Sequence, residues 1–222
     1  MKMMDVVLAG TRSFGVAALE TARKTAQVRA VVAPPDDKLA HRAAGLGLRV
    51  HHEVNPAVVA GADLLIAAHS HAFIGRKTRA ALKLGAIGYH PSLLPRHRGR
   101  DAVKWTVKMR DPIAGGTVYW LTDNVDGGPV AAQDWCFVDP TWDHSELWRE
   151  ELFPMGLRLI ERVLRDLTRG VVVEVPQDER FATWEPSFGV PPLHRPELPE
   201  LGGRHGFAHV ARVDGRGALA PG

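Results

Sequence analysis

The chain has 222 residues, of which 45% are hydrophobic and 24% charged, and its formal net charge is only +3. These values are ordinary for a globular enzyme and exclude a disordered or fibrous chain, and the length is sufficient for a core of two or three layers. A surplus of three positive charges is too small to predict nucleic acid binding, although the isoelectric point is about 9.2.

Short apolar runs alternate with helical patterns through the first ninety residues. The first run, 5–9, ends at Gly10, and a turn over 10–15 leads into a helix expected at about 16–24. Further strands are expected at 28–33, 48–51, 62–68 and 86–90, with helices at 37–44 and 75–84. This alternation predicts a doubly wound, mostly parallel sheet.

The pattern changes in the second half of the chain. A helix is expected at 100–109, followed by two strands at 116–121 and 129–137. Because only 122–128 connects these strands, they should be antiparallel neighbours, which makes the sheet mixed. A long helix is expected at 142–168, interrupted around Pro154, and then an extended piece at 171–175. We expect one Rossmann-like α/β domain over residues 1–188, with helices on both faces, and a Pro/Gly-rich tail over 189–222.

The first turn resembles a dinucleotide-binding loop without completing the pattern. Arg12 stands where G-x-G-x-x-G has its middle glycine, the residue that lets the backbone approach a pyrophosphate. The chain also lacks the Gly-Lys-Ser/Thr of a P-loop. We therefore expect no dinucleotide cofactor.

The location of the protein is predicted from two features. Cys136 is the single cysteine, which excludes an internal disulfide and fits a reducing compartment. The apolar run near the N-terminus is too short for a signal peptide or a membrane span. The expectation is a cytoplasmic protein without a membrane partner.

His90 and Asp126 are the candidate catalytic residues. His90 ends the strand at 86–90 and enters a loop stiffened by Pro91 and Pro95, which is where an open α/β sheet usually carries its chemistry. His90 as a plain strand cap is an equally good interpretation. Asp126 lies in the glycine-rich loop between the antiparallel strands, whose ends should converge with that of His90. A carboxylate beside an imidazole favours the protonated ring, which can donate to an oxyanion or a leaving group.

Four stretches together resemble the folate-dependent formyltransferase family. They are GYHPSLLPRHRG at 88–99, GGTVYW at 115–120, DNVDGGP at 123–129 and LFPMGL at 152–157. Within that family the chain is most similar to the N-terminal hydrolase domain of 10-formyltetrahydrofolate dehydrogenase, including a later Val-Pro-Gln and Ala-Thr-Trp-Glu, and it is also similar to methionyl-tRNA formyltransferase. The resemblance covers roughly residues 5–186 and implies a formyltransferase fold.

The resemblance implies roles for particular residues. His90 matches the family's catalytic histidine, Asp126 its essential aspartate, and 10-formyltetrahydrofolate would be the formyl donor. A folate pocket is implied at Ala72, Phe73, Ile74 and Asp126, and less securely at Ser92, Leu93, Leu94 and Pro95. A core contact at the start of a helix is the competing interpretation of Phe73 and Ile74. A cis peptide bond is expected at Leu94-Pro95.

Two departures from the family leave the formyl acceptor open. Gly88 stands where many members have an asparagine that helps hold the formyl oxygen. The tail at 189–222 is too short to supply the C-terminal barrel that methionyl-tRNA formyltransferase uses, so tRNA is not expected as a partner. The acceptor is then an amine, a carrier thiol or water. The alternatives are a 10-formyltetrahydrofolate hydrolase and a folate-binding protein without catalysis, and the oligomeric state is undetermined.

The remaining candidates favour simpler interpretations. No metal site is expected, because His69 and His71 would point to opposite faces of an extended segment. Cys136 should be a core residue rather than a nucleophile. The tryptophans Trp105, Trp120 and Trp135 should fill the core. The arginines Arg96, Arg98 and Arg100 either form a solvated loop or receive an anionic group, and the sequence does not separate these two.

Overall fold

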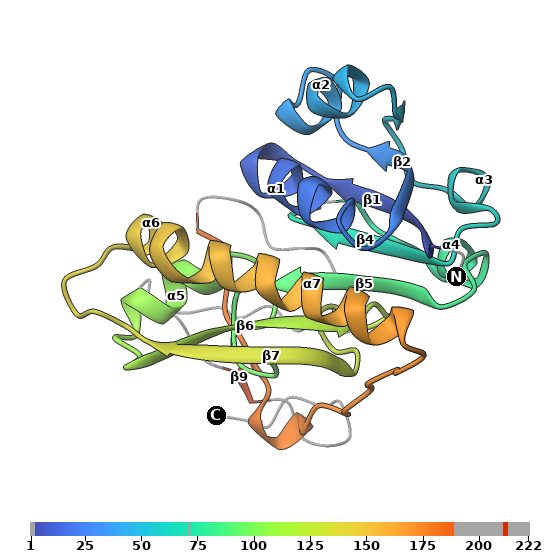
Figure 1. Ribbon diagram of the computed structural model, residues 1–222. Coiled ribbons are helices and arrows are strands. Elements are labelled where there is room, and N and C mark those ends of the chain that lie inside the picture. Colours follow the sequence, from blue (N-terminus) through green and yellow to red (C-terminus); the bar gives the residue numbers. More distant parts are fainter. Residues whose placement is uncertain (1–2, 71, 189–210, 213–222) are drawn as a thin grey trace.

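The computed structural model describes residues 3–70, 72–188 and 211–212, and a mixed sheet forms its centre (Figure 1). The seven strands lie in the order β3-β2-β1-β4-β5-β6-β7. Their bounds are β1 Asp5–Gly10, β2 Gln27–Val32, β3 Arg49–His51, β4 Leu64–Ala68, β5 Gly85–His90, β6 Ile113–Trp120 and β7 Val130–Phe137. The first five strands are parallel, whereas β6 runs antiparallel to both β5 and β7. The predicted mixed sheet is therefore confirmed.

Helices cover both faces of the sheet, as expected. The helices are α1 Arg12–Ala22, α2 Lys38–Gly45, α3 Pro56–Val59, α4 Arg76–Ala80, α5 Ala102–Lys108, α6 His144–Leu147 and α7 Phe153–Thr168. Along β1, Val6 and Leu8 join the core beneath α1, α2 and α7, while Val7 and Ala9 join a second core with residues of α3. Side chains of a strand alternate between faces, so a strand with apolar residues on both faces must be covered on both.

The structure corrects the limits of two helices. Helix α1 begins at Arg12 rather than at 16, because the carboxylate of Asp37 accepts a hydrogen bond from the Arg12 N–H and so supplies the partner that a first helical turn lacks. Helix α4 ends at Ala80 rather than at 84. The N–H groups of Lys83 and Leu84 bond to the carbonyls of Ala62 and Asp63, which turns the chain toward β5.

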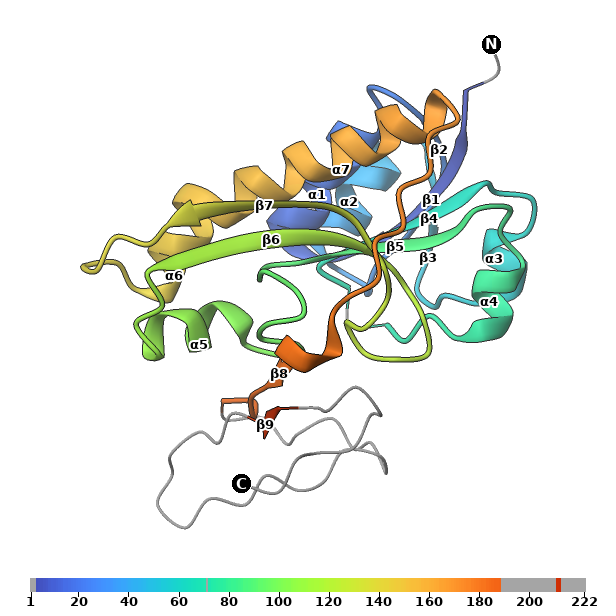
Figure 2. The ribbon, with the colours of Figure 1, turned by 90° about the horizontal axis from the view of Figure 1, so that it is seen from below.

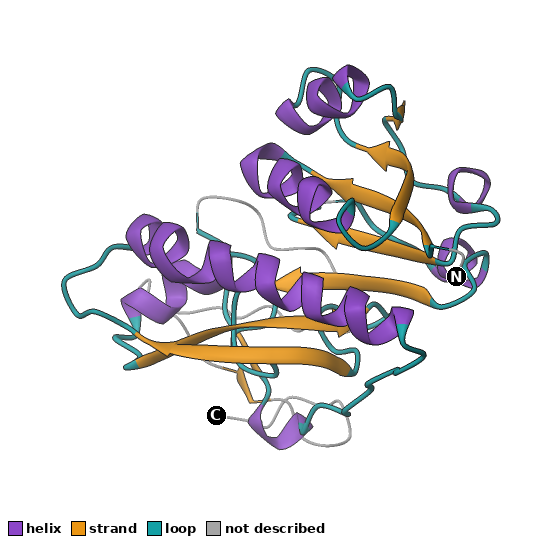
Figure 3. Ribbon diagram, in the orientation of Figure 1, coloured by secondary structure: helices purple, strands orange, loops and turns teal. Residues whose placement is uncertain are grey.

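The long helix expected at 142–168 is divided into three parts. Asp143 caps the start of α6, in a capping box with Glu146. A π-helical turn, Trp148–Leu152, separates α6 from α7, so the helix is interrupted just before Pro154. The phenol of Tyr89 donates to the Leu152 carbonyl at 2.6 Å and so ties β5 to the widened turn. Helix α7 then lies across β5, β6 and β7 (Figure 3).

The segment after α7 returns across the sheet toward the loop that follows β5. It leaves Gly170, bonds to β7 at Val175, and reaches the side of the sheet opposite α7 (Figure 2). A 3-10 turn, Glu179–Phe181, leads to β8 Thr183–Trp184, which pairs with β9 Ala211–Arg212. The rest of the expected tail at 189–222 lies outside the described residues. Within the described ranges, no helix is long and apolar enough to cross a membrane.

Candidate active site

His90 is the last residue of β5, at the edge where the parallel strands end. Its ring is 8% exposed and lies on the face of the sheet opposite α7, since Tyr89 belongs to the core beneath that helix. His90 Nε2 is 2.7 Å from the carbonyl oxygen of His97. A carbonyl only accepts, so Nε2 carries the proton of this bond. The other nitrogen, Nδ1, lies 3.7 Å from Oδ2 of Asp126. Because Nε2 is engaged by the His97 carbonyl, Nδ1 is the ring atom that can exchange a proton with a substrate.

Asp126 is held by donors from two different elements. Its Oδ1 accepts from the Tyr119 hydroxyl at 2.6 Å, and its Oδ2 accepts from the Gly99 N–H at 2.7 Å. The loop can place Asp126 there because Gly128 packs directly on the Trp120 carbonyl, where a Cβ would lie 1.7 Å from that oxygen. Two charge-assisted hydrogen bonds orient both carboxylate oxygens.

A second layer of polar side chains supports the Asp126 loop. Gln177 Nε2 donates to the carbonyls of Asp126 and Gly128, both at 2.7 Å. Arg98, 4% exposed, donates to the Gln177 amide oxygen and pairs with Glu179 at 2.6 Å. Sequence reasoning gave Gln177 no role, although its Val-Pro-Gln context was part of the family resemblance and could have identified it.

The arginines of the loop after β5 have different environments. Arg98 is buried with Gln177 and Glu179, and so it is neither solvated nor open to an external anion. Arg96 donates to both oxygens of Asp111, and its side chain is still 44% exposed. Arg100 is partly exposed.

The three predicted folate contacts, at 72–74, lie in different environments. Phe73 is 71% exposed, while Ile74 is 5% exposed and packs in the core beside α3 and α4. Ala72 donates its N–H to Ser70 Oγ at 3.2 Å. The core interpretation therefore holds for Ile74, and Phe73 presents an aromatic ring to solvent. Asp123 pairs with Arg76 and Arg79 of α4 and so links this region to the Asp126 loop.

The loop at 92–95 is packed on β6. Thr117 donates to the Ser92 carbonyl at 2.7 Å and accepts from the Leu94 N–H, and Gln133 donates to the Leu94 carbonyl at 2.9 Å. Ser92 and Leu94 are 2% and 4% exposed, so these two residues offer little surface. The Leu94-Pro95 peptide is cis, as predicted.

Position 88 is already crowded. A Cβ at Gly88 would lie 3.0 Å from Cδ2 of Leu121 and 3.4 Å from Cε1 of Tyr119. An asparagine side chain has no free space here unless those two residues move.

Other expectations have mixed outcomes. Trp105 and Trp120 are buried as predicted, but Trp135 is 53% exposed because it lies on the edge strand β7, on the face away from α7. The described residues hold no group of three or more His, Cys, Asp or Glu side chains suited to a metal ion, and His71 is outside them. Burial raises the pKa of the half-buried Cys136 thiol to about 11, which opposes a role as nucleophile.

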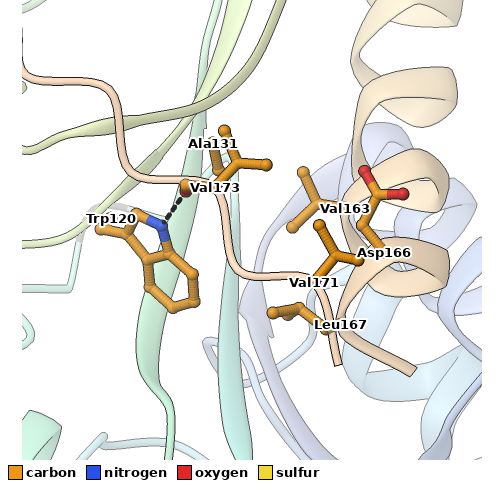
Figure 4. A pocket seen from close by; sticks show the side chains of 7 residues that line it. All are labelled: Trp120, Ala131, Val163, Asp166, Leu167, Val171 and Val173. Carbon is orange, nitrogen blue, oxygen red and sulfur yellow. Dashed lines mark hydrogen bonds between the residues drawn. The ribbon is translucent and has the colours of Figure 1, made fainter. Parts of the chain in front are cut away.

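Two hollows in the described part of the structure lie away from His90 and Asp126. One, of about 10 Å³, lies between α7, the valines that follow it and Trp120, whose indole donates to the Val173 carbonyl (Figure 4). A surface hollow of about 520 Å³ is lined by residues of β2, β3 and α3, among them Arg29, Arg49 and Asn55. Neither contains His90 or Asp126, so the candidate site rests on side-chain geometry.

A dinucleotide is expected not to bind at the turn after β1. Asp37 places its carboxylate against the first N–H of α1, at 2.9 and 3.0 Å, so a negative charge already occupies the place that a pyrophosphate needs. Calorimetric titration with NAD or NADP should give no saturable heat at micromolar concentrations. A micromolar dissociation constant would contradict this expectation.

Comparisons with known proteins settle the family. The family model described as Formyl transferase matches residues 3–154, which is more than half of the chain. The chain belongs to the formyl transferase family. It is 38% identical over 125 residues to mitochondrial 10-formyltetrahydrofolate dehydrogenase of Homo sapiens, covering 56% of this chain and 14% of that protein. This formyl transferase chain thus spans about one seventh of the length of that relative.

A further relative and a solved structure are also similar to this chain. Methionyl-tRNA formyltransferase of Lactobacillus delbrueckii subsp. bulgaricus is 27% identical over 206 residues, covering 84% of this chain and 65% of that protein. The crystal structure of an N-formyltransferase from Helicobacter canadensis, in complex with folinic acid and dTDP-3-aminofucose, superposes with a TM-score of 0.69 at 14% identity. The superposition covers 82% of this chain and 70% of that one, and it shows the shared fold.

Proposed function

We propose that this formyl transferase moves the formyl group of 10-formyltetrahydrofolate to an amine or carrier acceptor, using His90 and Asp126. One observation carries the proposal: His90 Nδ1 and Asp126 Oδ2 face each other at 3.7 Å at the carboxyl edge of the sheet, on side chains that are 10% and 12% exposed. Nearly dry surroundings strengthen the attraction between an imidazolium and a carboxylate.

The geometry supports a specific division of labour. The His90 Nε2 proton is fixed on the His97 carbonyl, so Nδ1 of the protonated ring donates to the formyl oxygen as negative charge develops there. Asp126 places its carboxylate beside the ring and takes a proton from the attacking amine. The N10–formyl bond then breaks, the acceptor nitrogen keeps the formyl group, and N10 of the folate receives the proton that left the amine.

Folate as the donor is supported by the names of relatives. The dehydrogenase relative is named for 10-formyltetrahydrofolate, and the Helicobacter structure contains folinic acid. In this chain Phe73 presents a 71% exposed ring beside α4, which is suited to cover a pterin.

Hydrolysis is the second candidate. The observation in its favour is the 38% identity to 10-formyltetrahydrofolate dehydrogenase, together with Gly88 in the place of a side-chain amide. Water would then attack, and formate and tetrahydrofolate would leave. A binding protein without catalysis is the third candidate. The methionyl-tRNA formyltransferase relative keeps tRNA among the acceptors to be tested.

The deciding experiment incubates the full chain with 10-formyltetrahydrofolate, alone and with a panel of amines, a carrier thiol and initiator methionyl-tRNA. Tetrahydrofolate, formate and formylated acceptor are measured separately. A formylated product supports transfer, formate without an added acceptor supports hydrolysis, and saturable binding without either product supports the binding protein. No binding at millimolar folate would overturn all three.

Phe73→Asp is expected to weaken binding of 5-formyltetrahydrofolate by about tenfold or more, because a carboxylate replaces an apolar ring at the proposed pterin contact. Phe137→Asp is a matched control, since Phe137 is 72% exposed but lies on the edge strand β7. Calorimetry on both variants measures the effect. Equal affinities would place the folate elsewhere.

A further inference from the structure

Gly88 and Tyr119 face each other across neighbouring strands. They are paired in the antiparallel register of β5 and β6. A Cβ at position 88 would lie 3.4 and 3.6 Å from two ring carbons of Tyr119, which is ordinary van der Waals contact, and 3.0 Å from Cδ2 of Leu121, which is tight. The Tyr119 ring therefore packs directly against the backbone of Gly88, beside the Leu121 side chain.

The Tyr119 hydroxyl is a hydrogen-bond donor to Asp126. Tyr119 is 7% exposed, and its hydroxyl donates to Asp126 Oδ1 at 2.6 Å. Burial, and then the negative charge of Asp126, raise the pKa of this phenol well above its ordinary value. The hydroxyl therefore stays protonated over the whole range in which an enzyme works.

The hydrogen bond from Tyr119 determines which oxygen of the Asp126 carboxylate faces His90. With Oδ1 held by Tyr119, only Oδ2 remains to meet the Gly99 N–H and to face His90 Nδ1. If one of the two donors is removed, the carboxylate is free to rotate about its Cβ–Cγ bond. The 3.7 Å approach to His90 then loses one of its two supports.

We propose that Tyr119 is the positioning residue that orients Asp126 toward His90. This inference rests on the proposed function of the His90–Asp126 pair. In place of a side-chain amide at position 88, the chain has a tyrosine hydroxyl that acts through the aspartate.

The chain offers an exact control, because it has two tyrosines. Tyr89, on β5, is also buried and also donates its hydroxyl at 2.6 Å, but to the Leu152 carbonyl on the α7 side of the sheet. Tyr119→Phe and Tyr89→Phe thus each remove one buried hydroxyl and one hydrogen bond. Similar small losses in thermal midpoint are expected for both variants.

The turnover number kcat should distinguish Tyr119→Phe from Tyr89→Phe. Tyr119→Phe is expected to lower kcat for formyl release by about 10- to 100-fold, the factor expected for a lost hydrogen bond to a charged group, with KM for the folate nearly unchanged. Tyr89→Phe should keep the wild-type kcat.

Equal kcat for the two phenylalanine variants would overturn the inference. A second readout does not need activity. The ¹³C carboxyl resonance that disappears in Asp126→Asn should shift in Tyr119→Phe and stay in place in Tyr89→Phe. If wild-type protein releases no formyl group but this shift occurs, the proposed function fails while the positioning of Asp126 by Tyr119 stands; an unshifted resonance overturns the positioning itself.

Discussion

Replacing His90 with alanine is expected to slow single-turnover formyl release by about 10²- to 10⁴-fold, the usual contribution of general acid–base catalysis. Nδ1 is the acid–base atom that faces Asp126 in the site, so no neighbouring group takes over its donation. Folate affinity should remain near the wild-type value, since the ring is 8% exposed and contributes little surface.

Asp126→Asn is expected to slow single-turnover formyl release by the same factor, for a different physical reason. The amide keeps the shape of the side chain and one acceptor, but it removes the charge that stabilises the imidazolium. His41→Ala is a suitable control, because that side chain is 70% exposed on α2. Rapid-quench measurement of tetrahydrofolate checks all three variants. Near-wild-type rates for His90→Ala and Asp126→Asn would make the pair structural and leave a folate-binding protein.

Much of the sheet was predictable because its signals are local. The apolar runs at 5–9 and 62–68 read directly as strands buried on both faces, and the short link 122–128 required an antiparallel pair. Helix limits were less predictable because they depend on distant partners. The early start of α1 needs the Asp37 carboxylate, which is 25 residues away from Arg12 in sequence.

In the candidate site, too, residues with local sequence signals were predictable, and residues that depend on distant partners were not. His90 and Asp126 were identified from strand ends and from motifs, which are properties of short stretches. Tyr119 reads as an ordinary strand residue, and only the register of β5 against β6 shows that it fills the space beside Gly88. His97 was likewise overlooked, because its partners Asp111 and Glu185 lie 14 and 88 positions further along the chain.

Glu185 and His97 form the buried pair whose loss should most reduce stability. Glu185 Oε1 lies 3.0 Å from His97 Nδ1, and the two side chains are 1% and 3% exposed. The opposite ring nitrogen, Nε2, contacts Asp111 at 2.7 Å. Within the described residues neither carboxylate oxygen of Glu185 has a hydrogen bond of good geometry, so the contact with His97 is what compensates its burial.

The protonation of His97 gives this pair a pH dependence. Burial opposes the charged ring, but Glu185 and then Asp111 outweigh it and raise the pKa of His97 above 6.5. A raised folded-state pKa means that the stabilisation is complete below pH 6.5 and is lost as the pH rises through the folded-state value. The folded protein should therefore lose this contribution on the alkaline side.

Glu185→Gln is expected to lower the free energy of unfolding by about 3 kcal/mol at pH 6, the low end of the cost of breaking a buried ion pair, because Asp111 still faces the ring. For a chain of this size the thermal midpoint should fall by roughly 6–12 °C. Glu20→Gln is the control, since Glu20 pairs with Arg23 and Arg42 at the surface and should cost under about 1 kcal/mol.

Thermal unfolding followed by circular dichroism from pH 5 to 9 measures both parts of the prediction. The gap between wild type and Glu185→Gln should be widest at and below pH 6.5 and should narrow as the pH rises. A gap independent of pH would mean that His97 is neutral in the folded protein. Because the His97 carbonyl accepts the Nε2 proton of His90, and Gly99 binds Asp126, a loosened loop should also slow formyl release in Glu185→Gln. If Glu185→Gln is less stable but keeps the wild-type turnover, the Glu185–His97 pair stabilises the fold without holding His90 and Asp126 in place.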